Sequence, residues 1–344
     1  MTGLSKKVFI NHKAILILLI YVFLSFIWSY DKISTLKASM FLFLSTILLM
    51  GLLYKNQLRN SAYALKNYFL TVVFLSSIFY FVGIGQMGEP YPGVLNGIFP
   101  HKNILGRVCA IGVIFFGCYW YSYRKNKDIL YLLFCFAFLI LSESKGAISI
   151  LVISIIVFFL VYNSYKGSLI KKIASITIIV SSFILISYVL TNAEVILELL
   201  GKDITLTGRT FLWDLALEYL RDQYIFGYGY DVFWTSVIDY NKLTAYEIYW
   251  EAPHAHNGYL DLLLDVGFIG LLLYLYCNIK LIKDGMNAIK KSGSNGKALL
   301  LFSVLTLIYL LVSSFVEKSY FQYNDIQWCF FIFSSFFIDE IKRT

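Results

Sequence analysis

The stretch EAPHAHNGYLDLLLDVGFIG, residues 251–270, begins as a polar loop and continues as a strongly apolar helix. Pro253 restricts the residue before it to extended geometry, so we do not expect the helix to begin earlier. Asn257 is a preferred N-cap, and Asp261 falls near the first turn, where the helix dipole favours an acid. His254 and His256 are therefore predicted at the mouth of a membrane helix, facing water or a cavity. The alternative is that each is a polar residue satisfied near lipid headgroups.

The composition of the whole chain is that of an integral membrane protein. Hydrophobic residues make up 59% of the 344 residues, well above the ~45–50% apolar share of soluble domains. The five cysteines fall inside or at the edges of apolar runs, so neither a disulfide framework nor a zinc site is indicated. The first apolar run lacks a signal-peptidase pattern and is interpreted as the first span.

Ten apolar runs approach the ~20 residues that a helix needs to cross a bilayer. They are residues 14–29, 36–54, 68–83, 104–121, 129–141, 147–162, 173–190, 258–282, 298–316 and 326–338. The sequence thus predicts an all-α, polytopic transmembrane helical bundle of about ten spans, as a single integral membrane domain over 1–344. Only residues 142–146 separate the fifth and sixth runs, so one long hairpin or a re-entrant break is an alternative there.

The basic residues between the runs predict the orientation. With the N-terminus in the cytoplasm and every run crossing, most of the 29 Lys and Arg residues fall in cytoplasmic segments, which is the positive-inside pattern. Both termini are then cytoplasmic, and His101, His254 and His256 lie on the outer side. The net charge of +8 follows from this topology, and no nucleic-acid partner is needed to explain it.

The long outer loop between the seventh and eighth runs, residues 191–253, contains a predicted amphipathic helix. Its apolar residues recur at helical spacing and could lie on the membrane or pack at an interface; they are Phe211, Leu212, Leu215, Ala216, Tyr219 and Leu220. Arg209 begins this helix, where the helix dipole disfavours a cation. An anionic partner would reverse that effect. The helix is followed by a glycine turn, residues 226–230, whose aromatics could line a substrate path.

Two further outer segments place cations where an anion would stabilise them. His101, Lys102, Asn103 and Arg107 surround the start of the fourth run, and helix N-termini with basic side chains bind phosphates well. Lys145, in the Ser-Glu-Ser-Lys-Gly turn at 142–146, is a candidate for another phosphate contact. The alternative in both places is pairing with lipid headgroups or, for Lys145, with Glu143.

These motifs, in this order, resemble the bacterial O-antigen ligase and polymerase family, which includes exopolysaccharide polymerases. The ordered features are a G-x-F-x-H-K-N-x-L-G loop, the S-x-S-K-G turn, a T-G-R-x-x-x-W segment, a glycine turn, and H-x-H-N with nine residues before G-x-x-G. They cover residues 97–270. Lys145 stands where many members have Arg, and twelve spans are common in the ligases.

The resemblance implies a metal-independent, GT-C-like membrane glycosyltransferase. Its donor would be a glycan on undecaprenyl pyrophosphate and its acceptor a glycan lipid, at the periplasmic face of the bacterial inner membrane. His256 would be the general base and Arg209 the stabiliser of the departing pyrophosphate. His254, Asn257, His101, Lys102, Asn103, Arg107 and Lys145 would bind substrate. A flippase and a chain-length regulator would be further partners, besides membrane lipids.

The residues themselves agree with this chemistry. A sugar pyrophosphate is already activated, so the reaction needs a base near neutral pKa and cations at the leaving group, and no cofactor is expected. H-x-H as a zinc pair lacks a convincing third ligand in the sequence. Within the family the H-K-N-x-L-G loop favours a polymerase over a ligase. A non-enzymatic polysaccharide or lipid-carrier transporter is the competing class; inverted repeats or buried paired charges would favour it.

Overall fold

The computed structural model describes residues 11–89, 91–168, 170–171, 173–174, 177, 209–239, 254–292, 294–318, 321–322 and 325–343. The side chains of residues 166, 209–211 and 294–295 are not described. Most of the predicted seventh span, and residues 191–208 and 240–253 of the long loop, therefore lie outside the described residues. This includes Pro253.

The described residues form a helical protein, as predicted. The elements are α2 (Lys13–Leu24), η1 (Ser25–Ile27), α3 (Lys32–Val82), α4 (Lys102–Tyr123), α5 (Asn126–Leu141), α6 (Lys145–Lys166), α9 (Arg209–Gln223), η2 (Phe233–Val237), α11 (Gly258–Lys291), α12 (Ser294–Ser313) and α13 (Ile326–Arg343). An isolated antiparallel bridge joins Gln86 to Leu95. The described part contains no strand beyond that bridge.

Five of the described helices are long and apolar enough to cross a membrane, namely α3, α4, α6, α11 and α12. A shorter apolar helix covers Lys13–Ile27. The chain is thus a multi-pass membrane protein by length and composition, whereas the count of ten spans stays a prediction. Predicted spans five and six are separate helices, α5 and α6, joined at residues 142–144.

Helix α3 contains the second and third predicted spans in one 51-residue element. Its helical geometry is interrupted only at Gln57, whose φ is 62° and ψ is 170°. The polar residues on either side stay helical because this segment has neither Gly nor Pro and is rich in Leu, Lys and Arg. A single residue, rather than a loop, therefore makes the connection between the two predicted spans.

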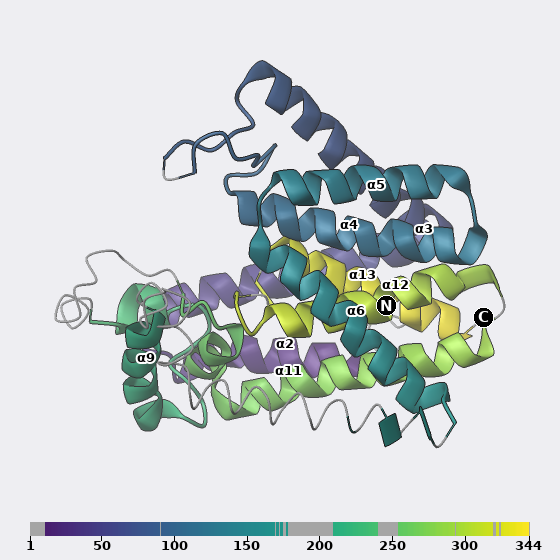
Figure 1. Ribbon diagram of the computed structural model, residues 1–344. Coiled ribbons are helices and arrows are strands. Elements are labelled where there is room, and N and C mark those ends of the chain that lie inside the picture. Colours follow the sequence, from purple (N-terminus) through teal and green to yellow (C-terminus); the bar gives the residue numbers. More distant parts are fainter. Residues whose placement is uncertain are drawn as a thin grey trace.

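Helix α12 is at the centre of the bundle. It contacts α4, α6, α11 and α13, and most of its apolar window is buried, in contrast to α3 and α6. A helix that is apolar on all sides belongs in such a core. In Figure 1 the long helices run side by side, α6 crosses them obliquely, and the second half of α3 leans away from the others.

Helix α11 is broken near its start, and a glycine turn fits against the break. Gly267 has φ 66° and ψ −171°, a conformation that is essentially restricted to glycine. A Cβ at Gly267 would also collide with the carbonyl oxygen of Ile225. A Cβ at Gly227, which has φ 71°, would likewise collide with the backbone of Asp265. The two glycines allow two backbones to touch.

This contact satisfies backbone groups that the break removes from the helix. The amide of Tyr228 donates to Leu264 O at 2.7 Å, and the amide of Phe268 donates to Tyr224 O at 2.9 Å. Tyr21 Oη donates to Val266 O at 2.9 Å. Within a bilayer each unsatisfied backbone group costs several kcal/mol, so the glycine turn stabilises the broken helix. The structure thus gives this turn a packing role, and the substrate path along its aromatics stays a prediction.

The predicted amphipathic helix is present as α9, and its apolar face is covered by protein. Leu212, Leu215, Ala216 and Leu220 are buried in a cluster with residues of η2 and the first turns of α11. Of the two interpretations of this face, packing within the protein is correct for these side chains. Figure 1 shows α9 lying across one end of the bundle, at a steep angle to α11.

The two ends of the described chain lie together at the opposite end of the bundle. His12 Nε2 is 2.8 Å from Tyr54 Oη, and His12 Nδ1 is 2.9 Å from Ser335 Oγ. Tyr54 Oη also donates to Asp339 Oδ2 at 2.6 Å. The start of α2, the middle of α3 and the end of α13 thus share one face of the molecule, which the basic segments predict to be cytoplasmic.

Reporter fusions test this orientation. A fusion at Ser292, between α11 and α12, and one after Arg343 should both report a cytoplasmic position, because both sites lie next to the basic segments. A fusion at Asp239, after η2, should report a periplasmic position. The measurement is paired alkaline phosphatase and fluorescent protein activity in cells. A cytoplasmic signal at Asp239 would overturn the predicted side of the histidine loop.

Candidate active site

The histidine loop is held by the first turn of α11. Asn257 is the N-cap, as predicted, and its Oδ1 accepts from the amides of Tyr259 at 3.1 Å and Leu260 at 3.3 Å. Asp261 is fully buried and reaches back into the loop, where its Oδ1 accepts from the amide of Ala255 at 2.9 Å. The same oxygen accepts from Trp234 Nε1 at 2.7 Å. The residue between the two histidines is therefore fixed by a buried carboxylate.

His254 and His256 are half-buried and touch each other. Their ring centroids are 4.2 Å apart, and the amide of His256 donates to His254 Nδ1 at 3.1 Å. An Nδ1 that accepts carries no proton, so His254 has its hydrogen on Nε2 when neutral. His256 has φ 52°, a left-handed conformation that costs a non-glycine residue about 1–2 kcal/mol. Such strain is typical of functional positions.

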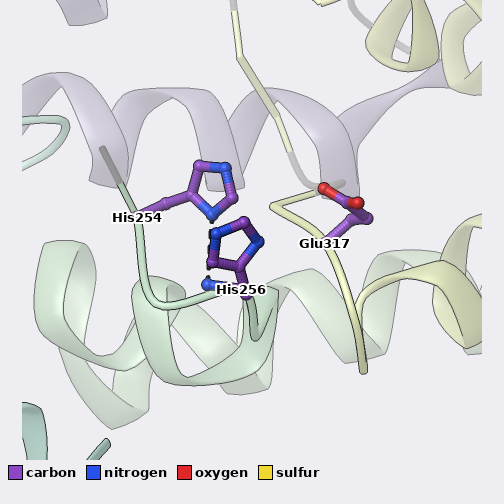
Figure 2. A group of neighbouring side chains, drawn as sticks. All are labelled: His254, His256 and Glu317. Carbon is purple, nitrogen blue, oxygen red and sulfur yellow. Dashed lines mark hydrogen bonds between the residues drawn. The ribbon is translucent and has the colours of Figure 1, made fainter. Parts of the chain in front are cut away.

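Glu317 completes this group from the segment that follows α12. The amide of Gly258 donates to Ser314 O at 2.7 Å, and Tyr259 Oη donates to Leu311 O at 2.8 Å, so the start of α11 is tied to the end of α12. Figure 2 shows the carboxylate of Glu317 pointing back toward the two imidazoles. A nitrogen of each ring and a carboxylate oxygen of Glu317 all lie within 4.8 Å of one another.

Arg107 connects the start of α4 to the same group. Its Nη1 lies 3.9 Å from Glu317 Oε2, with both side chains largely buried. One turn earlier, Asn103 Oδ1 accepts from Ser144 Oγ at 3.2 Å, and Gly106 leaves room for Ser144. The fold therefore brings the H-K-N loop, the S-x-S-K-G turn and the histidine loop to one end of the bundle.

The other predicted phosphate ligands lie around the start of α4 and α6. His101 is the N-cap of α4, and its Nδ1 accepts from the amide of Asn103 at 3.1 Å. Burial, together with Lys102 and Arg107, lowers the pKa of His101, which favours the neutral ring. Lys102 Nζ lies 3.9 Å from the centroid of the Tyr91 ring, a cation–π contact. Lys145 is exposed at the first residue of α6.

Arg209 is the first residue of α9, as predicted, while its side chain lies outside the described part. The helix that it begins is attached to the histidine loop, because Trp213 Nε1 donates to Ala255 O at 2.8 Å. The backbone of residues 209–213 is thus attached, through Trp213, to the loop that contains the candidate base.

A buried lysine lies beside the site and is absent from the predicted residues. Lys318 Nζ is 3.1 Å from Asp231 Oδ1 and 3.6 Å from Asp265 Oδ2. Burial opposes the charged form of Lys318, but the carboxylates of Asp265 and Asp231 more than compensate and raise its pKa. This ion-pair cluster joins the segment after α12 to the segment after the glycine turn and to α11.

Sequence reasoning missed both Glu317 and Lys318. They follow the ninth apolar run, in the short polar segment E-K-S-Y-F-Q-Y-N-D at 317–325. The sequence signal that could have indicated a functional role was the pair of adjacent charged residues between two predicted spans. Glu317 also supplies the third ligand whose absence from the sequence argued against a zinc pair. Two imidazoles and a carboxylate are a usual donor set for Zn²⁺, so the described residues could hold such an ion with small side-chain adjustments.

Comparisons with known proteins bear on this part of the chain. The family model described as O-antigen ligase matches residues 130–275. The exopolysaccharide production protein ExoQ of Rhizobium meliloti (strain 1021) is 28% identical over 129 residues. That alignment covers 37% of this chain and 29% of ExoQ. The two matches support an O-antigen ligase and polymerase-like family, and the resemblance predicted from the ordered motifs is confirmed.

The matched region divides the site. Residues 130–275 include Lys145, Arg209, His254, His256 and Asn257. The H-K-N loop, Arg107, Glu317 and Lys318 lie outside it. Of the polar groups around the histidine loop, Asp261 and Trp234 thus lie inside the matched region, whereas Glu317 and Arg107 lie outside it.

Replacing Lys318 tests the buried ion-pair cluster. Lys318→Met leaves Asp265, which is 1% exposed, without its cation, and breaking a buried pair costs about 3–5 kcal/mol of stability. Lys342→Met is the matched control. Lys342 also lies 3.1 Å from a carboxylate, that of Asp284, but is 52% exposed, so its loss should cost no more than about 1 kcal/mol.

The measurement is the thermal unfolding midpoint of each purified variant in detergent. Lys318→Met should unfold at a clearly lower temperature than Lys342→Met. Adding Asp265→Asn to Lys318→Met should recover part of the loss, since it removes the uncompensated charge. Equal midpoints for the two lysine variants would show that the buried cluster does not stabilise the fold.

Proposed function

We propose that this protein is a membrane glycosyltransferase that polymerises undecaprenyl-pyrophosphate-linked oligosaccharide repeat units at the periplasmic face, in O-antigen or exopolysaccharide biosynthesis. The observation that carries this proposal is the convergence of His254, His256, Glu317 and Arg107 at one end of a membrane bundle. The match to an O-antigen ligase model over the histidine loop supports it.

His256 acts as the general base in the proposed reaction. A hydroxyl oxygen of the acceptor glycan attacks the anomeric carbon of the donor sugar and forms the new glycosidic bond. The bond from that carbon to the pyrophosphate oxygen breaks, and the lipid pyrophosphate leaves with the electron pair. The hydroxyl proton passes to the imidazole. An ordinary histidine is largely neutral at physiological pH and ready to accept it.

Glu317 and His254 position the base. The hydrogen bond from the His256 amide to His254 Nδ1 holds the strained turn, and the carboxylate of Glu317 beside the rings favours the imidazolium that forms during transfer. Arg107 faces the same carboxylate across 3.9 Å. A pyrophosphate entering between the H-K-N loop and the histidine loop would offer Arg107 a second anionic partner.

The acceptor decides between the two candidate activities. The family model carries the description O-antigen ligase, and a ligase would transfer the finished glycan from undecaprenyl pyrophosphate to lipid A-core. The match to an exopolysaccharide production protein and the H-K-N-x-L-G loop favour the polymerase. In a reconstituted reaction a polymerase yields a ladder of lengthening glycans on the carrier lipid, whereas a ligase yields modified lipid A-core.

Substitution of the histidines tests the base. His256→Ala should lower glycan transfer by about 10²–10⁴-fold, which is the usual contribution of a general base. His254→Ala should be milder, because His254 positions the loop and a single base suffices. The assay is the full-length protein in liposomes with a pyrophosphate-linked donor. Near-normal turnover by His256→Ala would remove it as the base.

The same assay examines the metal alternative. If His254, His256 and Glu317 hold an ion needed for transfer, EDTA should abolish activity and added Zn²⁺ should restore it. If His256 is a free base, EDTA should leave the rate unchanged. Bound metal is measured directly by elemental analysis of the purified protein, compared with that of the Glu317→Ala variant.

Arg209 is proposed to stabilise the departing pyrophosphate. Arg209→Ala should lower transfer nearly as much as loss of the base, because removal of a preorganised charge partner typically costs ~10²–10³ in rate. Arg209→Lys should recover only part of it, since an ammonium cannot make the two-pronged contact of a guanidinium. Arg221→Ala, in the last turn of the same helix, is the control and should stay near wild type.

A further inference from the structure

A polar cavity lies at the end of the bundle opposite the histidines. It has a volume of about 1370 Å³ and opens beside the interruption of α3 at Gln57. The turn between α4 and α5, the start of α12 and the end of α13 complete its walls. Because α12 runs from Gly296 at this cavity to the segment of Glu317 at the histidines, the two sites are separated by the length of that helix.

The walls of this cavity carry an excess of positive charge. Its basic residues are Arg59, Lys66, Lys125 and Lys127, and its acidic residue is Glu340. Lys66 lies 3.9 Å from the buried Asp128. For Arg59, Lys125 and Lys127, the described residues provide no carboxylate within ion-pairing distance. Three exposed cations therefore face one concave space.

The other polar side chains of the walls are those of Gln57, Asn60 and four tyrosines, Tyr54, Tyr63, Tyr119 and Tyr123. The Tyr54 hydroxyl already donates to Asp339. Phenolic hydroxyls donate hydrogen bonds to phosphate oxygens, and their rings fit against the glycerol and upper acyl carbons of a lipid. Tyr63 is 64% exposed on the second half of α3, whose outer face is strongly apolar. The cavity thus borders the surface that the bilayer would cover.

We propose that this cavity binds the phosphate-bearing headgroup of an anionic phospholipid, held by Arg59, Lys125 and Lys127. Basic pockets between transmembrane helices on the cytoplasmic side bind such headgroups, and each Lys or Arg near an anionic leaflet is worth about 1 kcal/mol. The cations come from α3 (Arg59), from the turn after α4 (Lys125) and from the first turn of α5 (Lys127). A bound lipid would therefore connect the interruption of α3 to the helix that begins at the H-K-N loop.

Native mass spectrometry of the full-length protein tests this assignment. The probes are cardiolipin, phosphatidylglycerol and, as the zwitterionic comparison without net charge, phosphatidylcholine. The Lys125→Gln/Lys127→Gln variant should bind the two anionic lipids about thirty-fold more weakly, as expected for two lost contacts. Lys283→Gln/Lys291→Gln removes the same charge from exposed lysines near the same end that do not line the cavity, and its lipid binding should be unchanged.

Three outcomes would overturn the proposal. Equal losses in both double variants would indicate diffuse attraction to the membrane surface. Equal retention of phosphatidylcholine and phosphatidylglycerol would show that the net negative charge of the headgroup is not recognised. The third outcome combines two results: the Lys125→Gln/Lys127→Gln variant binds the anionic lipids as well as the unaltered protein does, yet it loses a saturable binding of inorganic pyrophosphate. These results would assign the cavity to a soluble phosphate ligand. Arg59→Gln, on a different helix, provides a second variant if the double variant does not fold.

Discussion

The backbone contact between the glycine turn and the break in α11 is the constraint on which the outer end of the molecule depends. A helix in a bilayer cannot be interrupted unless its freed amides and carbonyls find partners. Tyr224–Gly229 provides them, and only glycine at 227 and 267 lets the two backbones meet. The break then redirects the first turns of α11 against α9 and η2, where Asp261 fixes the loop between the histidines. The location of the site follows from this contact.

The sequence predicted the features that depend on local chemistry. Asn257 as an N-cap, the start of α11, the amphipathic α9 and the apolar helices all follow from spacing and residue type, and the structure agrees. The G-x-x-G motif was recognised as part of a family signature. The structural reason for Gly267 could not be predicted from the sequence, because it depends on contact with Gly227, forty residues earlier in the chain. A local sequence pattern does not identify which distant segment packs against it.

The same limit explains the missed charges. Glu317 and Lys318 stand side by side in the chain but serve different partners: Glu317 faces the histidines and Arg107, and Lys318 is buried between two aspartates. In sequence they resemble an ordinary polar connection between spans. The buried charges also bear on the competing transporter class, since they lie at the mouth of α11 and are paired with each other, close to the end of the membrane helix. Charged groups at that position are better placed to hold the candidate active site than to relay ions or protons through the middle of the membrane.

The ion-pair cluster around Lys318 also constrains how the protein is made. Asp231 lies before α11, Asp265 within it, and Lys318 only after α12. Chains emerge from the ribosome and fold from the N-terminus, so the two aspartates are synthesised well before their cation. Until α12 has been inserted, Asp231 and Asp265 lack the cation of Lys318, and the histidines lack the carboxylate of Glu317. The group of Glu317 with the two histidines is thus completed only after α12 has been synthesised.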